Sequence, residues 1–178
     1  MLMQKFYALK LAEEKNIQVK KIEINHYLGE TYINNKKYNL LFPEYMINKL
    51  NDLSKEKKID YFFSGLITKH REWVRDFKEN AIIQESNYGK NRTTKYKLDI
   101  DYYTKMSMTK FSLCPIGDCP WSYRFFEAIM CKSIPIIGDN EKDILSDGYF
   151  FYRKSDKHIY DETKVEYNYK KFLERNKI

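Results

Sequence analysis

The segment from Cys114 to Asp139, CPIGDCPWSYRFFEAIMCKSIPIIGD, contains residue types that could bind an anion at the start of a helix. Gly117 and Asp118 lie in a loop that leads through Pro-Trp to Ser122, which suits the N-cap of a following helix. A glycine lets the backbone approach a ligand closely, and a helix N-terminus presents unpaired N–H groups with a partial positive charge. This combination is typical of a phosphate-sized anion site at a strand-to-helix turn.

The predicted helix carries two charged side chains within its first two turns. Arg124 offers a fixed fork of donors that suits a phosphate, and Glu127 is an acceptor for the two hydroxyls of a ribose. The apolar positions are expected to pack on a sheet: Phe125, Phe126, Ile129 and Met130. The same residues also suit a capped helix with an i,i+3 ion pair in any α/β protein, so the sequence leaves both interpretations open.

A second candidate loop follows the apolar strand IDYFFSG and opens another predicted helix. It contains Gly65, Lys69, His70 and Arg71, so basic or titratable groups lie close to a glycine. Lys69 or Arg71 could neutralise a phosphate there, and two such loops at neighbouring strand ends could grip a diphosphate from both sides. His70 is the only histidine near this predicted site, which makes it a candidate general base. A solvated basic turn is the alternative interpretation.

Neither the cysteines nor the paired aspartates predict a metal site. Cys114, Cys119 and Cys131 lack the short paired spacing of zinc ligands, and their odd number argues against a disulfide framework. We therefore expect reduced thiols, which suit an intracellular compartment. Asp99 and Asp101 form an Asp-x-Asp pattern, but this pattern opens a predicted helix, and we interpret Asp101 as the helix N-cap.

Length and composition predict one globular domain of ordinary size, or one domain with a small appendage. Of the 178 residues, 43% are hydrophobic and 16% aromatic, which is enough for an apolar core. The net charge of +7 is spread along the chain without a long basic run, so we expect a lysine-rich surface rather than a nucleic-acid groove. The chain has no apolar run of transmembrane length and no signal-peptide pattern, so we expect a soluble cytoplasmic protein.

Short apolar segments alternate with helical segments from residue 59 onward. The predicted strands cover about residues 59–65, 81–86, 111–115 and 133–138. This alternation predicts an α/β fold, a Rossmann-like and mainly parallel sheet with helices on both faces, whose ligands bind at the carboxyl ends of the strands. Residues 1–58 are expected to form a short N-terminal appendage of a helix, strands and a second helix, and residues 59–178 the main domain.

The run FSLCPIGDCPWSYRFFEAIMCKSIPIIG, residues 111–138, resembles the signature of exostosin-like glycosyltransferases. That signature is a strand ending in Cys-Pro-x-Gly-Asp, a Ser-x-Arg-x-x-Glu-Ala helix and a turn into Ile-Pro-Val-Ile. The segments DYFFSG and REWVRDF are similar to the first strand–helix unit of the same domain. The resemblance implies the C-terminal, nucleotide-sugar-binding half of a GT-B enzyme. Such an enzyme transfers a sugar from a donor such as a UDP-sugar to a hydroxyl acceptor, for example on a glycan, without an obligatory metal.

The resemblance also assigns roles to residues already singled out. These are Gly117, Asp118, Ser122 and Arg124 in the donor pocket, Glu127 at the ribose, and Lys69 or Arg71 at the diphosphate. The chain departs from the family at Cys131-Lys132-Ser133, where the family often has glycine. Only 58 residues precede Ile59, too few for the second Rossmann-like half, which usually supplies the general base in inverting GT-B enzymes. The alternative is a non-catalytic nucleotide-sugar-binding or assembly module that needs a homodimer or a partner chain.

Overall fold

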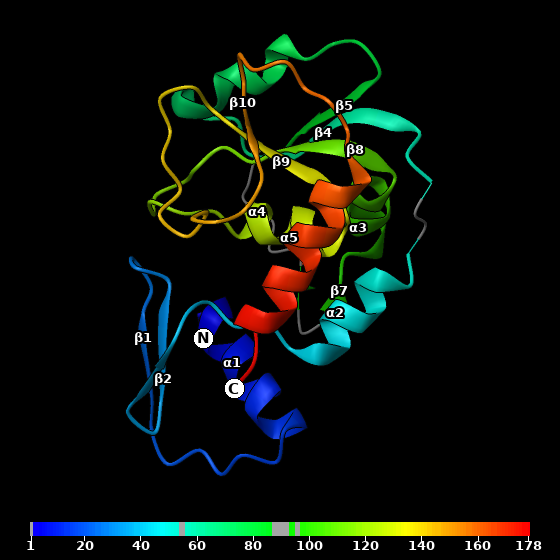
Figure 1. Cartoon of the computed structure of the whole chain (residues 1–178). Helices are drawn as coiled ribbons and strands as arrows, with labels where there is room; N and C mark the ends of the chain where they lie inside the picture. The colour runs from blue at the N-terminus through cyan, green and yellow to red at the C-terminus, as the bar shows by residue number, and fades with distance from the viewer. Residues whose placement is uncertain (1, 54–55, 87–92, 95–96) are drawn as a thin grey trace.

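The computed structural model describes residues 2–53, 56–86, 93–94 and 97–178, and its architecture is the α/β class that the sequence predicts. Five strands form one sheet in the order β10-β9-β8-β4-β5, and every neighbouring pair is parallel (Figure 1). The strands are β4 (Ile59–Gly65), β5 (Ala81–Glu85), β8 (Thr109–Leu113), β9 (Ile134–Ile137) and β10 (Tyr152–Arg153). This is the Rossmann-like sheet expected of one half of a GT-B enzyme.

Helices cover both faces of this sheet. They are α3 (Ile100–Ser107), α4 (Tyr123–Met130), α5 (Glu162–Arg175) and the 3₁₀ helix η1 (Lys69–Asp76). Phe62 belongs to the apolar cluster that includes α3 and α4, whereas its neighbour Phe63 belongs to the cluster that includes Val74 of η1 and Val165 of α5. Successive residues of a strand point to opposite faces, so the apolar run of β4 provides a core on both sides.

The residues before β4 form a group of shorter elements. They are α1 (Met3–Glu14), β1 (Ile22–Asn25), β2 (Glu30–Ile33), β3 (Lys36–Tyr38) and α2 (Glu44–Asn51). The three strands form an antiparallel sheet in the order β1-β2-β3. Asn34 and Asn35 make the turn between β2 and β3 with φ angles of 51° and 67°, a region that asparagine tolerates better than most residues. These elements follow one another in the order helix, strands, helix.

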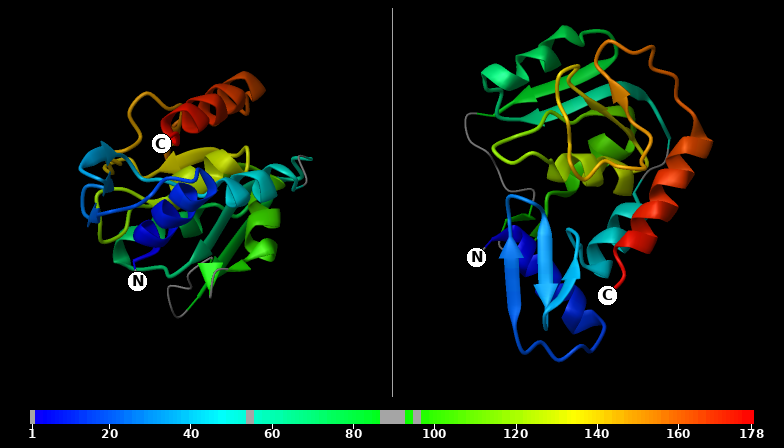
Figure 2. Two further views of the ribbon diagram at one scale, coloured as in Figure 1. Left: turned by 90° about the horizontal axis from the view of Figure 1, so that it is seen from below. Right: turned by 60° about the vertical axis from the view of Figure 1, so that its left-hand side comes forward.

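These N-terminal elements pack directly on α4 and α5 (Figure 2). The ring of Phe42 lies 6.0 Å from that of Tyr123, 6.2 Å from that of Phe126 and 5.5 Å from that of Phe172. Asn176, just after α5, both donates to the carbonyl of Phe42 and accepts from its N–H, each at 2.7 Å. Residues from opposite ends of the chain therefore share one apolar cluster.

Two local predictions differ from the structure. The N-cap of α3 is Asp99, whose carboxylate accepts a hydrogen bond from the N–H of Tyr102 at 3.1 Å. The prediction of Asp101 as the cap is wrong, because Asp101 lies inside the first turn and pairs with Lys105 at 2.6 Å. The segment after β4 is a 3₁₀ helix instead of an α-helix. The lysine- and tyrosine-rich sequence over about residues 87–100 predicts a polar loop. This segment lies largely outside the described residues, and the parts described include β6 (Thr93–Thr94) and β7 (Lys97–Leu98).

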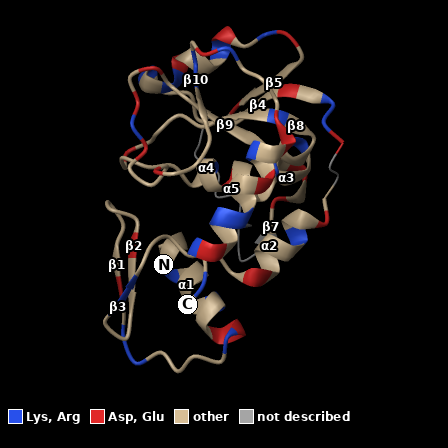
Figure 3. Ribbon diagram, viewed as in Figure 1, with Lys and Arg blue, Asp and Glu red and all other residues tan. Residues whose placement is uncertain are grey.

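Charged side chains of both signs are interspersed along the elements (Figure 3). Several form exposed ion pairs, such as Arg75 with Glu85 at 2.7 Å and Lys154 with Asp76 at 2.6 Å. Exposed pairs of this kind contribute little to stability, so the fold depends mainly on its apolar clusters. Within the part of the chain that the structure describes, no helix has both the length and the apolar character needed to cross a membrane.

Candidate functional site

The carboxyl ends of β4, β8 and β9 lie at one edge of the parallel sheet (Figure 1). The two predicted loops leave from there: β4 leads into residues 66–71, and β8 leads into residues 114–122. A third segment, residues 138–151, follows β9 and lies against the second loop, because the N–H of Ile144 donates to the carbonyl of Pro120 at 2.8 Å. The structure therefore brings the two predicted loops together and adds a third segment that the sequence analysis did not include.

Arg71 joins the first two loops. Its Nε donates to the carbonyl of Ile116 at 3.2 Å, and its Nη1 donates to the carbonyl of Leu66 at 3.1 Å. A Cβ on Gly117 would lie only 2.7 Å from Nη2 of Arg71. Gly117 thus allows a guanidinium group to lie directly on the loop after β8, which places positive charge between the two strand ends.

Arg124 is a second cation at this edge, and it is only 7% exposed. Its Nη2 donates to the carbonyl of Ser64 at 2.9 Å, and its Cζ lies 4.4 Å from the centre of the Phe63 ring. Its Nε has no hydrogen-bond partner, and no carboxylate of the described residues forms an ion pair with it. Burying a charge costs free energy unless the charge is paired. This guanidinium is therefore suited to an anion supplied by a ligand.

Ser122 caps α4 as predicted, since its hydroxyl accepts a hydrogen bond from the N–H of Arg124 at 3.2 Å. The N–H of Ser122 itself donates to Oδ2 of Asp143 at 2.9 Å. Two N–H groups at this helix end therefore have partners within the chain, which corrects the expectation of uncapped donors. The positive charge available to an anion comes mainly from the arginines.

Asp143 is a buried carboxylate that the sequence analysis missed. It is 2% exposed, and its Oδ1 accepts a hydrogen bond from the N–H of Leu145 at 2.9 Å. Burial raises the pKa of Asp143 to about 6, although the hydrogen bonds from the backbone of Leu145 and Ser122 oppose the rise. A single aspartate in an irregular segment carries no motif, so only the fold reveals that it supports the start of α4.

Glu127 points into the protein. It is 6% exposed, its Oε2 accepts a hydrogen bond from the hydroxyl of Tyr102 at 2.9 Å, and its Oε1 accepts one from the hydroxyl of Tyr103 at 3.0 Å. Burial and the nearby carboxylate raise the pKa of Tyr103 well above its usual range, so this tyrosine remains a donor. A ribose would share the carboxylate with these hydroxyls, and the ribose role of Glu127 stays a prediction.

The other predicted residues differ in their exposure. Lys69 and His70 are exposed at the start of η1, and Asp118 is exposed in the loop after β8. Gly65 is buried at the end of β4, where its carbonyl accepts a hydrogen bond from the N–H of Ser86 at 3.0 Å. Contacts of Lys69, Asp118 and Gly65 with a donor, and proton transfer by His70, stay predictions.

Glu141 connects η1, the loop after β8 and the segment after β9, and it was also absent from the sequence analysis. Its Oε2 accepts hydrogen bonds from the N–H of Ile116 at 3.1 Å and the N–H of Gly138 at 3.2 Å. Its Oε1 accepts one from the indole N–H of Trp73, in η1, at 3.1 Å. A carboxylate of the chain therefore lies among N–H donors from the ends of β8 and β9, where an anionic ligand was expected.

The turn between β1 and β2 lies against the loop after β8. The indole N–H of Trp121 is shared between the carbonyl of His26 at 3.0 Å and that of Tyr27 at 3.2 Å. The rings of Trp121 and His26 are 5.5 Å apart and nearly perpendicular. A Cβ on Gly29 would lie 2.6 Å from Cδ1 of Leu145, so the turn also packs closely on the segment after β9.

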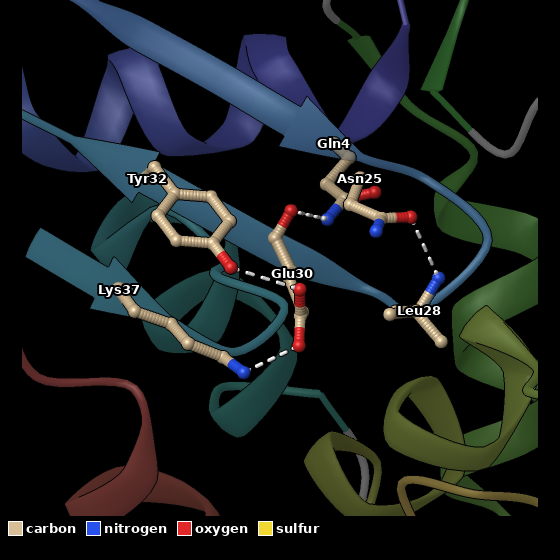
Figure 4. Close-up of polar contacts among 6 residues, drawn as sticks. All are labelled: Gln4, Asn25, Leu28, Glu30, Tyr32 and Lys37. Carbon is tan, nitrogen blue, oxygen red and sulfur yellow. Dashed lines mark hydrogen bonds and ion pairs between the residues drawn. The ribbon is translucent and has the colours of Figure 1, made fainter. Parts of the chain in front are cut away.

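Side chains around this turn hold its shape (Figure 4). The amide nitrogen of Gln4 donates to the carbonyl of Glu30 at 3.1 Å, and the N–H of Leu28 donates to Oδ1 of Asn25 at 3.2 Å. The Glu30 carboxylate in turn accepts from the hydroxyl of Tyr32 at 3.0 Å and from the ammonium group of Lys37. The oxygen of the buried Gln4 amide is left to face Nδ1 of His26 at 3.2 Å, so that ring nitrogen acts as the donor.

The cysteines show no sign of reactivity. Cys114 and Cys131 are buried, and burial raises the pKa of both thiols. Burial and the nearby Asp118 also raise the pKa of Cys119. Reactive thiols have lowered pKa values, so none of the three fits that role. Among the described residues, no group of three or more histidine, cysteine, aspartate or glutamate side chains is arranged to hold a metal ion.

Comparison with known proteins supports the resemblance in the sequence. A family model, the exostosin GT47 domain, matches residues 5–151. The chain is also 30% identical over 100 residues to a probable glucuronosyltransferase of Oryza sativa subsp. japonica. That alignment covers 53% of this chain and 23% of the rice protein, so the chain spans about a quarter of its relative. The family match contains the motif at 111–138 and extends to the N-terminal elements, and the chain belongs to the exostosin GT47 family of glycosyltransferases.

Proposed function

We propose that this chain is the donor-binding part of a glycosyltransferase that takes its sugar from a nucleotide diphosphate, with a UDP-sugar as the first candidate. The observation that carries the proposal is Arg124. Its guanidinium group is buried, has an Nε without a partner and lacks a paired carboxylate among the described residues. A pyrophosphate beside this guanidinium group would supply the missing charge.

In the proposed mechanism, the diphosphate lies between the loops after β4 and β8. Arg71 lies across Gly117 and Arg124 contacts the end of β4, so both cations border the same strand ends. When the bond between the sugar and the phosphate breaks, negative charge grows on the departing diphosphate. Guanidinium groups already fixed by carbonyl contacts stabilise that charge without reorganising. We assign charge neutralisation to these side chains, so the proposed reaction requires no metal.

The acceptor in this proposal is a hydroxyl group, for example on a glycan. The rice relative is a probable glucuronosyltransferase, which makes UDP-glucuronic acid the first donor to test. A second candidate function is a non-catalytic binding module, which is favoured by the chain's own Glu141 carboxylate lying among N–H donors where an anionic ligand was expected. A donor-hydrolysis assay separates the two, since turnover by the chain alone contradicts the module, whereas turnover only after a partner chain is added supports it.

Replacing Arg124 by alanine tests the donor site. We expect Arg124→Ala to weaken binding of UDP-glucuronic acid or another bound UDP-sugar by roughly 1–3 kcal/mol, the usual loss for a charged hydrogen-bond partner. That loss corresponds to about 5- to 150-fold in the dissociation constant measured by titration calorimetry. Arg75→Ala is the matched control, because Arg75 is an exposed arginine of η1 that pairs with Glu85. Equal affinities of the wild-type chain and Arg124→Ala would contradict the assignment.

A further inference from the structure

We propose that the ends of β8 and β9 form a phosphate subsite that the chain's own Glu141 carboxylate fills in the free protein. The proposal deepens the donor site described above and rests on it. Three N–H groups converge there, from the backbone of Ile116, the backbone of Gly138 and the indole of Trp73, at 3.1–3.2 Å from the carboxylate oxygens. Converging N–H groups of this kind bind phosphate as readily as carboxylate.

The backbone around the subsite does not depend on the Glu141 carboxylate for its shape. Nη1 of Arg153 donates to the carbonyls of Gly138 at 3.2 Å, Asp139 at 2.9 Å and Glu141 at 2.9 Å. The N–H of Glu141 also closes a turn with the carbonyl of Gly138 at 3.1 Å. These contacts involve only main-chain atoms of the turn. The N–H of Gly138 is therefore expected to stay in place when the carboxylate swings out.

The carboxylate reaches this position because residue 138 has no side chain. A Cβ on Gly138 would lie 2.9 Å from both the carboxyl carbon and Oε1 of Glu141, so the glutamate folds back over its own turn. No ion pair of Glu141 with a cation is found in the part of the chain that the structure describes, and its partners are N–H dipoles. A carboxylate held in this way occupies the place of an anionic ligand.

The subsite adjoins the cations of the donor site. Ile116 donates its N–H to Glu141 and accepts a hydrogen bond from Arg71 through its carbonyl, so the two groups contact the same residue. A diphosphate carries more negative charge than one carboxylate and is long enough to reach both the N–H groups and a guanidinium. It can therefore compete with Glu141, and the glutamate lowers the apparent affinity for diphosphate by requiring its own displacement.

The test measures binding of inorganic pyrophosphate by titration calorimetry. Glu141→Gln removes the charge and leaves an amide N–H₂ facing N–H donors, whereas Glu141→Ala removes the competing group altogether. We expect both variants to bind pyrophosphate about tenfold more tightly than the wild-type chain, the change for one charge-assisted hydrogen bond. Asp147→Asn removes an exposed charge from the same segment and controls for a general change in charge.

Two variants are used so that the test still gives a result if one of them fails to fold. If the folded variants bind pyrophosphate with unchanged or weaker affinity, or not at all, the proposal is overturned. Glu141 would then serve only to stabilise the local structure. As a second readout, the Trp73 indole N–H signal in nuclear magnetic resonance should shift more on adding pyrophosphate than that of Trp121, which is bound to His26. Because Arg124→Ala tests the donor site separately, normal donor binding with no effect at Glu141 leaves the proposed function intact.

Discussion

Three charged side chains near the start of α4 are buried, and each has a different kind of partner. Arg124 contacts a carbonyl and an aromatic ring, Glu127 accepts from two tyrosines, and Asp143 accepts from two backbone amides. The sequence pattern predicted that Arg124 and Glu127 share one helix. It could not predict that Tyr102 and Tyr103 lie against Glu127, because those contacts bridge more than 20 residues of chain.

Lys57 provides a prediction for a single residue away from the site. Its ammonium group donates to the carbonyls of Ser107 at 2.7 Å and Cys131 at 3.2 Å, and burial lowers the pKa of Lys57 from 10.5 to about 8. The unfolded chain therefore binds the proton more tightly than the folded chain. Burying the charged ammonium group of Lys57 therefore lowers the free energy of unfolding. This destabilisation is fully present below pH 8 and disappears as the pH rises through 8 toward 10.5.

We therefore expect the free energy of unfolding of Lys57→Met, relative to the wild type, to change with pH. The substitution should raise the free energy of unfolding by about 1–3 kcal/mol more at pH 7 than at pH 10. This range is set by the size of the pKa shift of Lys57. Urea unfolding of both proteins at several pH values measures this difference and cancels the titration of other groups. The exposed neighbour Lys58, replaced by methionine, is the control. A difference that is constant from pH 7 to pH 10 would refute the effect.

At the scale of elements, Trp121 couples the turn between β1 and β2 to the loop after β8. The side chain is 3% exposed and binds two carbonyls of the turn. We expect Trp121→Ala to lower the free energy of unfolding by about 3–5 kcal/mol, the usual cost of truncating a large buried side chain. Trp121→Phe keeps a ring but removes the N–H and should cost about 1–3 kcal/mol. Chemical denaturation measures both, with the exposed Phe150 replaced by alanine as control.

The sequence predicts the order of strands and helices more reliably than it predicts the type of each helix. The strands β4, β5, β8 and β9 and the helix α4 were predicted because short apolar runs alternate with an amphipathic segment. The 3₁₀ form of η1 was not predicted, since periodicity over eight residues does not separate it from an α-helix. The convergence of Gly117 and Arg71 follows from parallel topology, which places successive strand ends at one edge.

At the scale of the whole molecule, the N-terminal elements and the parallel sheet share an apolar cluster. The backbone of Phe42 is bound by Asn176, a residue 134 positions later. No local pattern reveals a contact across that distance, so the sequence predicted the N-terminal elements but not what they pack against. The family match from residue 5 to residue 151 likewise includes these elements with the predicted motif.

The proposed function requires a diphosphate site between the loops after β4 and β8. Thermal unfolding with a panel of UDP-sugars, UDP and uridine tests it directly, because a ligand that binds only the folded chain raises the melting temperature. At about 100 times the dissociation constant the gain is roughly 2.7 kcal/mol, or about 5–10 °C for a chain of this size. We predict such a rise with the diphosphate compounds and a much smaller one with uridine. Equal effects of uridine and UDP, or no rise with any of them, would contradict the site.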